Sequence, residues 1–315
     1  MSSRPDHSPA GYVEQLAETG TGGASEDPTR TTTRRERFEG KFNKRWREFK
    51  GELNDLLRGN SYYRPQNDVS DSQQIADFRD WVEDAIERIV VEPVRQRDAQ
   101  EGAHWTAQRV REFYTHGIDV ADRELRRVGY DVDADIDGTD VLRDDPSDLH
   151  QEQLAEEYLT VAQELEDVGR RTEQEITREY REAIGAGLAV GVTLDRLKER
   201  VDHSRAGKNA TRLLAHSYGV EITNDAAIER YYEAGVEQTG TVVEIDVHEE
   251  DGTEADFITA GDLRVCPTCR TYAAGGPYRL KAIRNGNAPK PVRDTHPACR
   301  CLIVPIPNTA TQPAS

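Results

Sequence analysis

The chain of 315 residues contains one methionine, three tryptophans and four cysteines, and it has no run of 18 apolar residues. Without such a run the sequence predicts no membrane span, because a helix needs about 20 mostly apolar residues to cross a bilayer. The N-terminal stretch MSSRPDHSPAGYVEQ also lacks the apolar core of a secretory signal. We therefore expect no oxidising compartment in which the cysteines would form disulfides.

The common signatures of catalysis are missing as well. The sequence contains no HExxH pattern, no complete H-x-E…P-C-x-x-C deaminase pattern, no G-x-S-x-G, no phosphate-binding P-loop and no dinucleotide-binding glycine run. No nucleophile, base and acid can be assigned as a set. The sequence therefore predicts a protein that is not an enzyme.

Basic residues are outnumbered by acidic ones, 41 against 59, which gives a formal net charge of −18. The mean hydropathy is low, at −0.79, and most of the basic residues are arginine. This composition is typical of proteins that work in concentrated salt, and we infer a salt-adapted host or virus. At 1 M salt the Debye length is only about 3 Å, so such a surface charge serves solvation more than long-range steering.

Two basic islands interrupt the acidic sequence. Residues 30–50 hold nine Arg and Lys against three Glu, and residues 262–304 hold eight against two Asp. Such runs are either ordinary solvated surfaces or surfaces that contact phosphates or an acidic partner. In the second interpretation the candidate contact residues are Arg34, Arg35, Lys41, Arg45, Arg279, Lys281, Arg284, Arg293 and Arg300.

Apolar residues recur at helical spacing through most of the chain. Asp27 and Pro28 are a plausible N-cap and first residue of the first helix, and Ser70 or Asp71 is expected to cap the second. The longest pattern, from about Ser147, has the spacing of four and three found in coiled coils and helical hairpins. The expected inward stripe of the first helix consists of Phe38, Phe42, Trp46, Phe49, Leu53 and Leu56.

The acidic stretch YDVDADIDGTDVLRDDPS separates two of these helical regions. Asp133, Asp135, Asp137 and Gly138 match the start of a calcium-binding loop, but Asp144 stands where that loop has its glutamate. We expect a solvated linker here rather than a calcium site.

All four cysteines lie near the C-terminal end, after a segment with β-strand character at Val243–Val247, and the last of them begins a second such segment, Cys301–Val304. Because a C-x2-C pair presents two thiolates on one tight turn, this spacing predicts a structural zinc site. Two disulfides or unligated thiols are the alternatives. Five candidates compete for four ligand positions: Cys266, Cys269, His296, Cys299 and Cys301.

This segment resembles the C-terminal signature of phage head-morphogenesis proteins, the Mu F-like minor head protein family, in its salt-adapted tailed-virus form. The resemblance depends on an aspartate before C-x2-C, a glycine-containing loop, and H-P-x-C-R-C followed by an apolar strand. It extends more weakly into the helix upstream. There the family usually has an Arg-Thr-Glu-like segment, and this chain has ATRLLAHSYG in its place. The matching residues are Asp262, Cys266, Cys269, Gly275 or Gly276, His296, Pro297, Cys299, Arg300 and Cys301, with Asn209, Asn224 and Gly235 upstream.

The resemblance implies a non-enzymatic virion protein that acts in capsid morphogenesis and in genome packaging or ejection. Its expected partners are the portal protein or the interior of the major capsid protein, together with packaged double-stranded DNA contacted without regard to sequence, and no membrane. Its expected location is the capsid interior or portal vertex, and the host cytoplasm during assembly. Two other functions remain open: a zinc-ribbon regulatory protein that binds nucleic acid, and a metal-dependent hydrolase or nuclease that uses His296.

The sequence thus predicts a mainly α-helical body with long, hairpin-like or coiled-coil-like helices and a small C-terminal α+β zinc-binding module. The expected segments are a disordered arm (1–27), a helical region with a basic first helix (28–129), an acidic linker (130–147), a long-helix region (148–236), the Mu F-like zinc module (237–307) and a tail (308–315).

Overall fold

The computed structural model describes residues 29–60, 63, 70–133, 136–144, 148–203, 207–236, 238–242, 267–297 and 299–306. The prediction of a mainly helical protein with few strands is confirmed. The described chain forms two compact units, each built from separate stretches of sequence. The described residues of unit 1 fall within 29–34, 110–154 and 216–306, and those of unit 2 within 35–109 and 155–215. The expected arm at 1–27 and the strand expected at Val243–Val247 lie outside the described residues.

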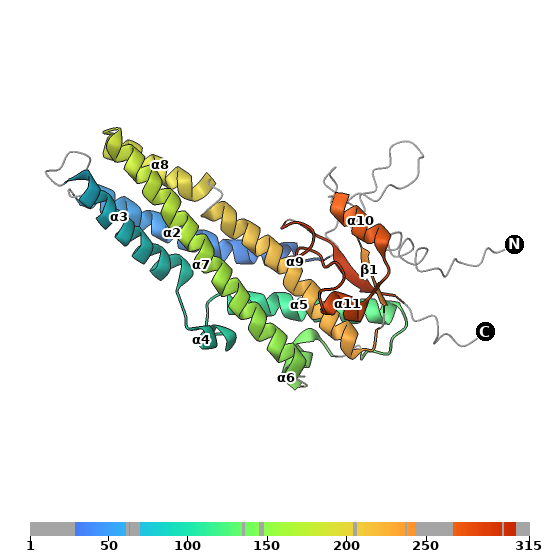
Figure 1. The fold of residues 1–315 in the computed structure, drawn as a ribbon. Coiled ribbons are helices and arrows are strands. Elements are labelled where there is room, and N and C mark those ends of the chain that lie inside the picture. The colour runs from blue at the N-terminus through green and yellow to red at the C-terminus, as the bar shows by residue number, and fades with distance from the viewer. Residues whose placement is uncertain are drawn as a thin grey trace, which may run out of the picture. The chain divides into compact units, whose positions relative to one another are not determined.

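Figure 1 shows the elements in chain order. The helices are α2 (Thr32–Gly59), α3 (Asp71–Ile86), the π-helix η2 (Glu87–Val91), α4 (Gln96–Gln100), α5 (Ala107–Arg127), α6 (Gly138–Asp144), α7 (Asp148–Gly185), α8 (Val190–His203), α9 (Lys208–Glu233), α10 (Pro267–Gly275) and α11 (Leu280–Arg284). The strands are β1 (Gln238–Val242), β2 (Tyr278–Arg279) and β3 (Leu302–Pro305). No described helix is long and apolar enough to cross a membrane.

Unit 2 is a helical assembly with an aromatic core. The inward stripe of α2 is buried as expected, except that it ends on Leu57, while Leu56 is half-buried. Ser70 caps α3 by accepting a hydrogen bond from the Gln73 backbone N–H at 3.4 Å. Phe78 of α3 stacks on Tyr180 of α7 with the ring centroids 3.7 Å apart.

Unit 1 packs the C-terminal module against α5 and α9. Figure 1 shows α5, α9 and α11 in this part of the chain, and one buried cluster of side chains joins these helices to β3. Gly117 of α5 allows a close approach to α9, because a Cβ atom at this position would lie 2.4 Å from the Thr223 carbonyl oxygen. The buried cluster consists of Ala121, Leu125, Ala227, Ile228, Tyr231, Val236, Leu280, Ile283 and Ile303.

The three strands of unit 1 form an antiparallel sheet in the order β2-β1-β3. In the register of the sheet, Val242 lies opposite Leu302 and Thr239 lies opposite both Pro305 and Tyr278. The closing strand expected at Cys301–Val304 is present as β3, and all four of its residues are buried.

Part of the acidic stretch between α5 and α7 is helical. Helix α6 begins at Gly138, directly after Asp137. The Asp137 carboxylate accepts hydrogen bonds from the backbone N–H groups of Thr139 and Asp140 at 2.8 and 3.0 Å. An aspartate in this position caps a helix, so the cap accounts for this carboxylate without a cation.

Candidate metal centre

Helix α10 carries the first cysteine of the cluster. It begins at Pro267, and proline is favoured at the first helical position because its missing N–H would have no partner there. Cys269 follows in the first turn and is buried. The other cysteine of the C-x2-C pair, Cys266, lies outside the described residues.

Cys299 and Cys301 come from the turn that leads into β3. The Cys299 backbone N–H donates to the His296 carbonyl oxygen at 3.0 Å, and the Cys301 backbone N–H donates to the Cys299 sulfur at 3.5 Å. This second bond orients the Cys299 sulfur and stabilises negative charge on it. The loop therefore presents two sulfurs towards α10 from positions two residues apart.

The sulfurs of Cys269, Cys299 and Cys301 form one buried group. Their Sγ atoms all lie within 4.8 Å of one another, and each side chain is 1–2% exposed. The three are free thiols, and the Cys269–Cys299 sulfur distance is 3.8 Å, whereas a disulfide bond is about 2.05 Å long. Thiolates held about 2.3 Å from a tetrahedral zinc ion are about 3.8 Å apart. The spacing therefore suits a shared metal ion.

The three sulfurs perturb one another's protonation. The neighbouring Cys269 and Cys301 thiols lower the pKa of the Cys299 thiol by donating hydrogen bonds to its thiolate. In turn, Cys269, Cys299 and burial raise the pKa of the Cys301 thiol. Several thiolates at this spacing in a buried site repel one another. A divalent cation is the partner that would allow all of them to ionise together.

His296 lies in the same turn but does not belong to the sulfur group. It is half-buried. Among the described residues, the group of potential metal ligands whose ligand atoms lie within 4.8 Å of one another consists of the three cysteines and does not include His296. A small hollow beside the sulfurs is lined by other residues of the module, namely Tyr272, Pro289, Lys290, Pro291 and Thr295. The structure thus brings together three of the five candidate ligands.

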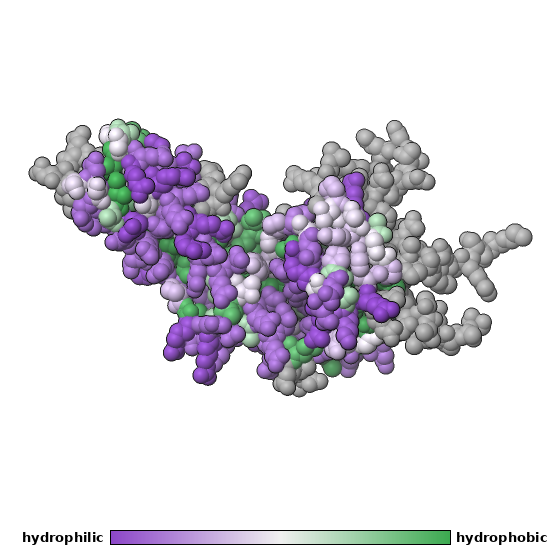
Figure 2. All heavy atoms as spheres, in the orientation of Figure 1, coloured by the Kyte–Doolittle hydropathy of each residue, from purple (hydrophilic) through white to green (hydrophobic). Residues whose placement is uncertain are grey.

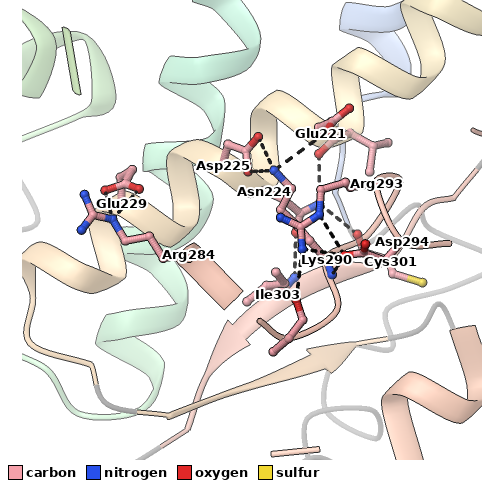
Figure 3. A network of polar contacts seen from close by, with 12 residues as sticks. Glu221, Asn224, Asp225, Glu229, Arg284, Lys290, Arg293, Asp294, Cys301 and Ile303 are labelled. Atoms are coloured by element: carbon pink, nitrogen blue, oxygen red, sulfur yellow. Dashed lines mark hydrogen bonds and ion pairs between the residues drawn. The ribbon is translucent and has the colours of Figure 1, made fainter. Parts of the chain in front are cut away.

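The segment between α11 and the late cysteines is held on α9 by charge. Lys290 donates to both carboxylate oxygens of Asp225 at 2.6 and 2.8 Å, and Glu221 lies 3.9 Å from the same ammonium group. Burial raises the pKa of Glu221, while Lys290 opposes that shift. Figure 3 shows these side chains between α9 and the loop. The basic module therefore docks on an acidic face of α9.

A second ion pair lies further along the same face of α9. The Arg284 Nε donates to both carboxylate oxygens of Glu229 at 2.9 and 3.0 Å (Figure 3). Sequence reasoning did not single out these carboxylates. Their signal was polar residues at positions 221, 225 and 229, one helical turn apart, on a helix that otherwise buries apolar residues.

Several candidate contact residues are used inside the molecule. Arg45 donates to the Ile89 carbonyl oxygen and to Glu92 and lies 4.2 Å from the Trp105 ring centroid. Arg284 pairs as described above, and Arg293 pairs with Asp294 at 2.6 Å. Three more candidates are half-buried and make contacts of their own, namely Arg34, Arg35 and Arg300. The remaining three are exposed: Lys41, Arg279 and Lys281.

Comparisons of the chain with protein-family models, with curated proteins and with solved structures gave no match.

Proposed function

We propose that the chain is a minor head protein of a tailed virus, associated with the portal, with a C-terminal end stabilised by a structural zinc ion. One observation carries this proposal: Cys269 of the C-x2-C motif lies close to Cys299 and Cys301 of the H-P-x-C-R-C motif. These are the two motifs on which the resemblance to the Mu F-like family depends. The zinc fits because the three buried sulfurs lie within 4.8 Å of one another and one pair is at 3.8 Å, the separation expected around a tetrahedral zinc ion. Cys266 or His296 supplies the fourth ligand in this proposal.

The zinc ion would act as a cross-link between α10 and the turn before β3. The described sheet has two strands of four or five residues and one of two. So small a structure has little apolar area of its own, and metal binding contributes directly to the free energy of folding in such cases. The role of the metal would be to fix a rigid surface that a capsid or portal partner can dock against.

The remaining surface fits a protein of the virion interior in concentrated salt. Figure 2 shows a largely hydrophilic face, in keeping with the net charge of −18. Contacts with packaged DNA would involve the exposed Lys41, Arg279 and Lys281. Phosphate contacts of this kind carry no sequence information and weaken steeply as salt rises. DNA binding is therefore proposed only where the DNA is already concentrated by packaging.

The virion assignment is tested by locating the chain. Particles from the salt-adapted host are purified on a density gradient, opened by chelation or low salt, and analysed by quantitative mass spectrometry. We expect a few copies per particle, co-purifying with the portal. Finding the chain in the infected-cell lysate but absent from particles and portal complexes would overturn the assignment. Selective binding of one DNA sequence at high salt would support a zinc-ribbon regulator instead.

The metal centre is tested with the reduced full-length chain. We expect about one zinc per chain by elemental analysis, and thiolate-to-metal charge-transfer absorption when Co²⁺ replaces it. Cys301→Ser should lose the ion, whereas Ala274→Ser, at an exposed position of α10, should keep it. Comparing Cys266→Ser with His296→Ala identifies the fourth ligand. A metal-free wild-type chain that remains folded would refute the centre.

A further inference from the structure

Asn224 of α9 is fully buried and uses both ends of its amide against the turn and strand that follow the late cysteines. Its Nδ2 donates to the Cys301 carbonyl oxygen at 3.1 Å, and its Oδ1 accepts from the Ile303 backbone N–H at 2.8 Å. Nδ2 also donates to the Val220 carbonyl oxygen of its own helix at 2.9 Å. Figure 3 shows Asn224 facing Cys301 and Ile303.

These bonds occupy the edge of β3 that faces away from β1. In a strand, the N–H and C=O groups of alternate residues point to the same edge. Residues 302–305 all lie opposite β1 residues in the register, but the N–H and C=O groups of Ile303 and the C=O group of Cys301 are bonded to α9 side chains. Tyr231 completes this edge, since its hydroxyl donates to the Ile303 carbonyl oxygen at 3.2 Å. Asn224 and Tyr231 therefore take the place of a neighbouring strand.

A buried asparagine in the middle of a helix is unusual, because the side chain competes with the helical backbone. The neighbouring buried Thr223 shows the ordinary solution, since its hydroxyl donates to the Gly219 carbonyl oxygen of its own helix at 2.7 Å. Asn224 makes the equivalent bond to Val220 and in addition reaches residues 77 and 79 positions away. Its separate donor and acceptor match the spacing of a C=O and an N–H two residues apart on one strand edge.

We propose that Asn224 is a positioning residue of the metal centre, which fixes the backbone at Cys301 so that the Cys301 sulfur meets those of Cys269 and Cys299. The inference rests on the proposed metal centre. The Cys301 peptide is held on both sides: its N–H donates to the Cys299 sulfur and its carbonyl oxygen accepts from Asn224. With both groups fixed, the Cα–Cβ bond of Cys301 has one direction, and rotation about that bond is the one remaining motion that sets where the sulfur lies relative to those of Cys269 and Cys299.

Groups that orient metal ligands without touching the metal usually change metal affinity by about 10–100-fold when they are removed. We therefore expect Asn224→Ala to release zinc to a chromophoric chelator about 10–100-fold faster than the wild-type chain. The Co²⁺ form should show a weaker or shifted charge-transfer band. The measurement is made in the reduced full chain, under conditions in which far-ultraviolet circular dichroism shows the helices to be folded.

Three further variants separate positioning from general stability. Thr223→Val is the matched control, because it changes the adjacent buried residue without touching β3, and it should release zinc at the wild-type rate. Tyr231→Phe removes a bond to the same strand, two residues further from the sulfur, and should change release less than Asn224→Ala does. If Asn224→Ala does not fold, Asn224→Thr is used in its place. The threonine hydroxyl can bond the Val220 carbonyl oxygen of the same helix, but it cannot supply the separate donor and acceptor that the asparagine amide gives to Cys301 and Ile303.

The outcomes for the two proposals are distinct. A wild-type chain that takes up neither zinc nor Co²⁺ refutes the metal centre and, with it, the positioning role. Wild-type uptake with unchanged release and an unchanged Co²⁺ band in the Asn224 variant refutes the positioning role alone. Equal acceleration by the Asn224 and Thr223 variants would assign the effect to loss of stability in α9, and would likewise overturn it.

Discussion

The ion pair between Lys290 and Asp225 provides the sharpest test of how the C-terminal module is held. The two side chains are 13% and 10% exposed, and Glu221 lies beside them. Lys290→Met keeps the length of the apolar stem but removes the ion-pair partner of Asp225 and one of the two cations that act on Glu221, the other being Arg293. Removing one partner of a buried pair typically costs about 3–5 kcal/mol, because the remaining charge is desolvated and uncompensated. We expect a loss of unit 1 stability of that order.

Lys281→Met is the matched control. It makes the same substitution and the same change of charge in the same module, at an exposed position of α11. Substitutions on the surface usually change stability by less than about 0.5 kcal/mol. Stability is measured by urea unfolding, with hydrogen–deuterium exchange of peptides from α9 and from residues 280–294 to follow unit 1. The difference between the variants should persist in molar salt, because salt screens buried pairs much less than exposed ones.

The Lys290 variant also has a distinctive pH dependence. Burial raises the pKa of Glu221 and Lys290 opposes this shift, so removing the lysine should raise that pKa further. A carboxyl with a raised pKa in the folded state binds protons more tightly there than in the unfolded chain. The stability lost in Lys290→Met should therefore be partly regained as the pH falls towards the folded-state pKa of Glu221. Equal stabilities of the Lys290 and Lys281 variants at all pH values would refute the reasoning.

Three other predictions concern the packing, the acid limb and the metal. Gly117→Ala should destabilise unit 1 by about 1–3 kcal/mol or more, because the new Cβ would lie 2.4 Å from the Thr223 carbonyl oxygen. Gly51→Ala is the control: it has open space around it and should stabilise α2 by up to about 1 kcal/mol. Both are measured by thermal unfolding. Burial raises the pKa of Asp294, but hydrogen bonds from Arg293 and from the Lys290 backbone N–H outweigh it and hold that pKa below its ordinary value. The stability that this carboxylate contributes is therefore present above the unfolded-state pKa of aspartate, about 3.9, and is lost as the pH falls through the folded-state pKa. Asp294→Asn should flatten this acid limb in pH-dependent urea titrations, and an unchanged slope would count against the assignment. Chelation under reducing conditions should increase hydrogen exchange across residues 267–305 and leave unit 2 unchanged, and retained protection there would mean that no metal holds the module.

Local patterns determined much of this protein from sequence alone. The inward stripe of α2 was predicted correctly up to Leu53, Ser70 was one of the two predicted caps of α3, and the strand after Cys301 was predicted and is present. Each of these depends on residues a few positions apart, whose contacts follow from the helical or strand repeat itself. The clustering of the cysteines likewise predicted a metal clamp, and three of the candidate ligands do lie together.

Tertiary structure decided how the basic islands are used. The sequence favoured neither solvent nor a partner for them, but Arg284 and Lys290 turn towards carboxylates of α9, and Arg45 lies on Trp105. Charge runs predict a basic surface only when their counterions lie outside the molecule. The acidic face of α9 lies more than 50 residues away in sequence, beyond the reach of any local pattern.

The position of the third sulfur was decided in the same way. The spacing of Cys299 and Cys301 is a local fact, but the direction of the Cys301 side chain depends on a strand edge bonded to Asn224, 77 residues earlier. Sequence alone determined which residues are able to bind a metal, because thiols and their spacing are written in it. Only the fold determined which of them meet, because that depends on how a helix and a strand from distant parts of the chain satisfy each other's buried hydrogen bonds.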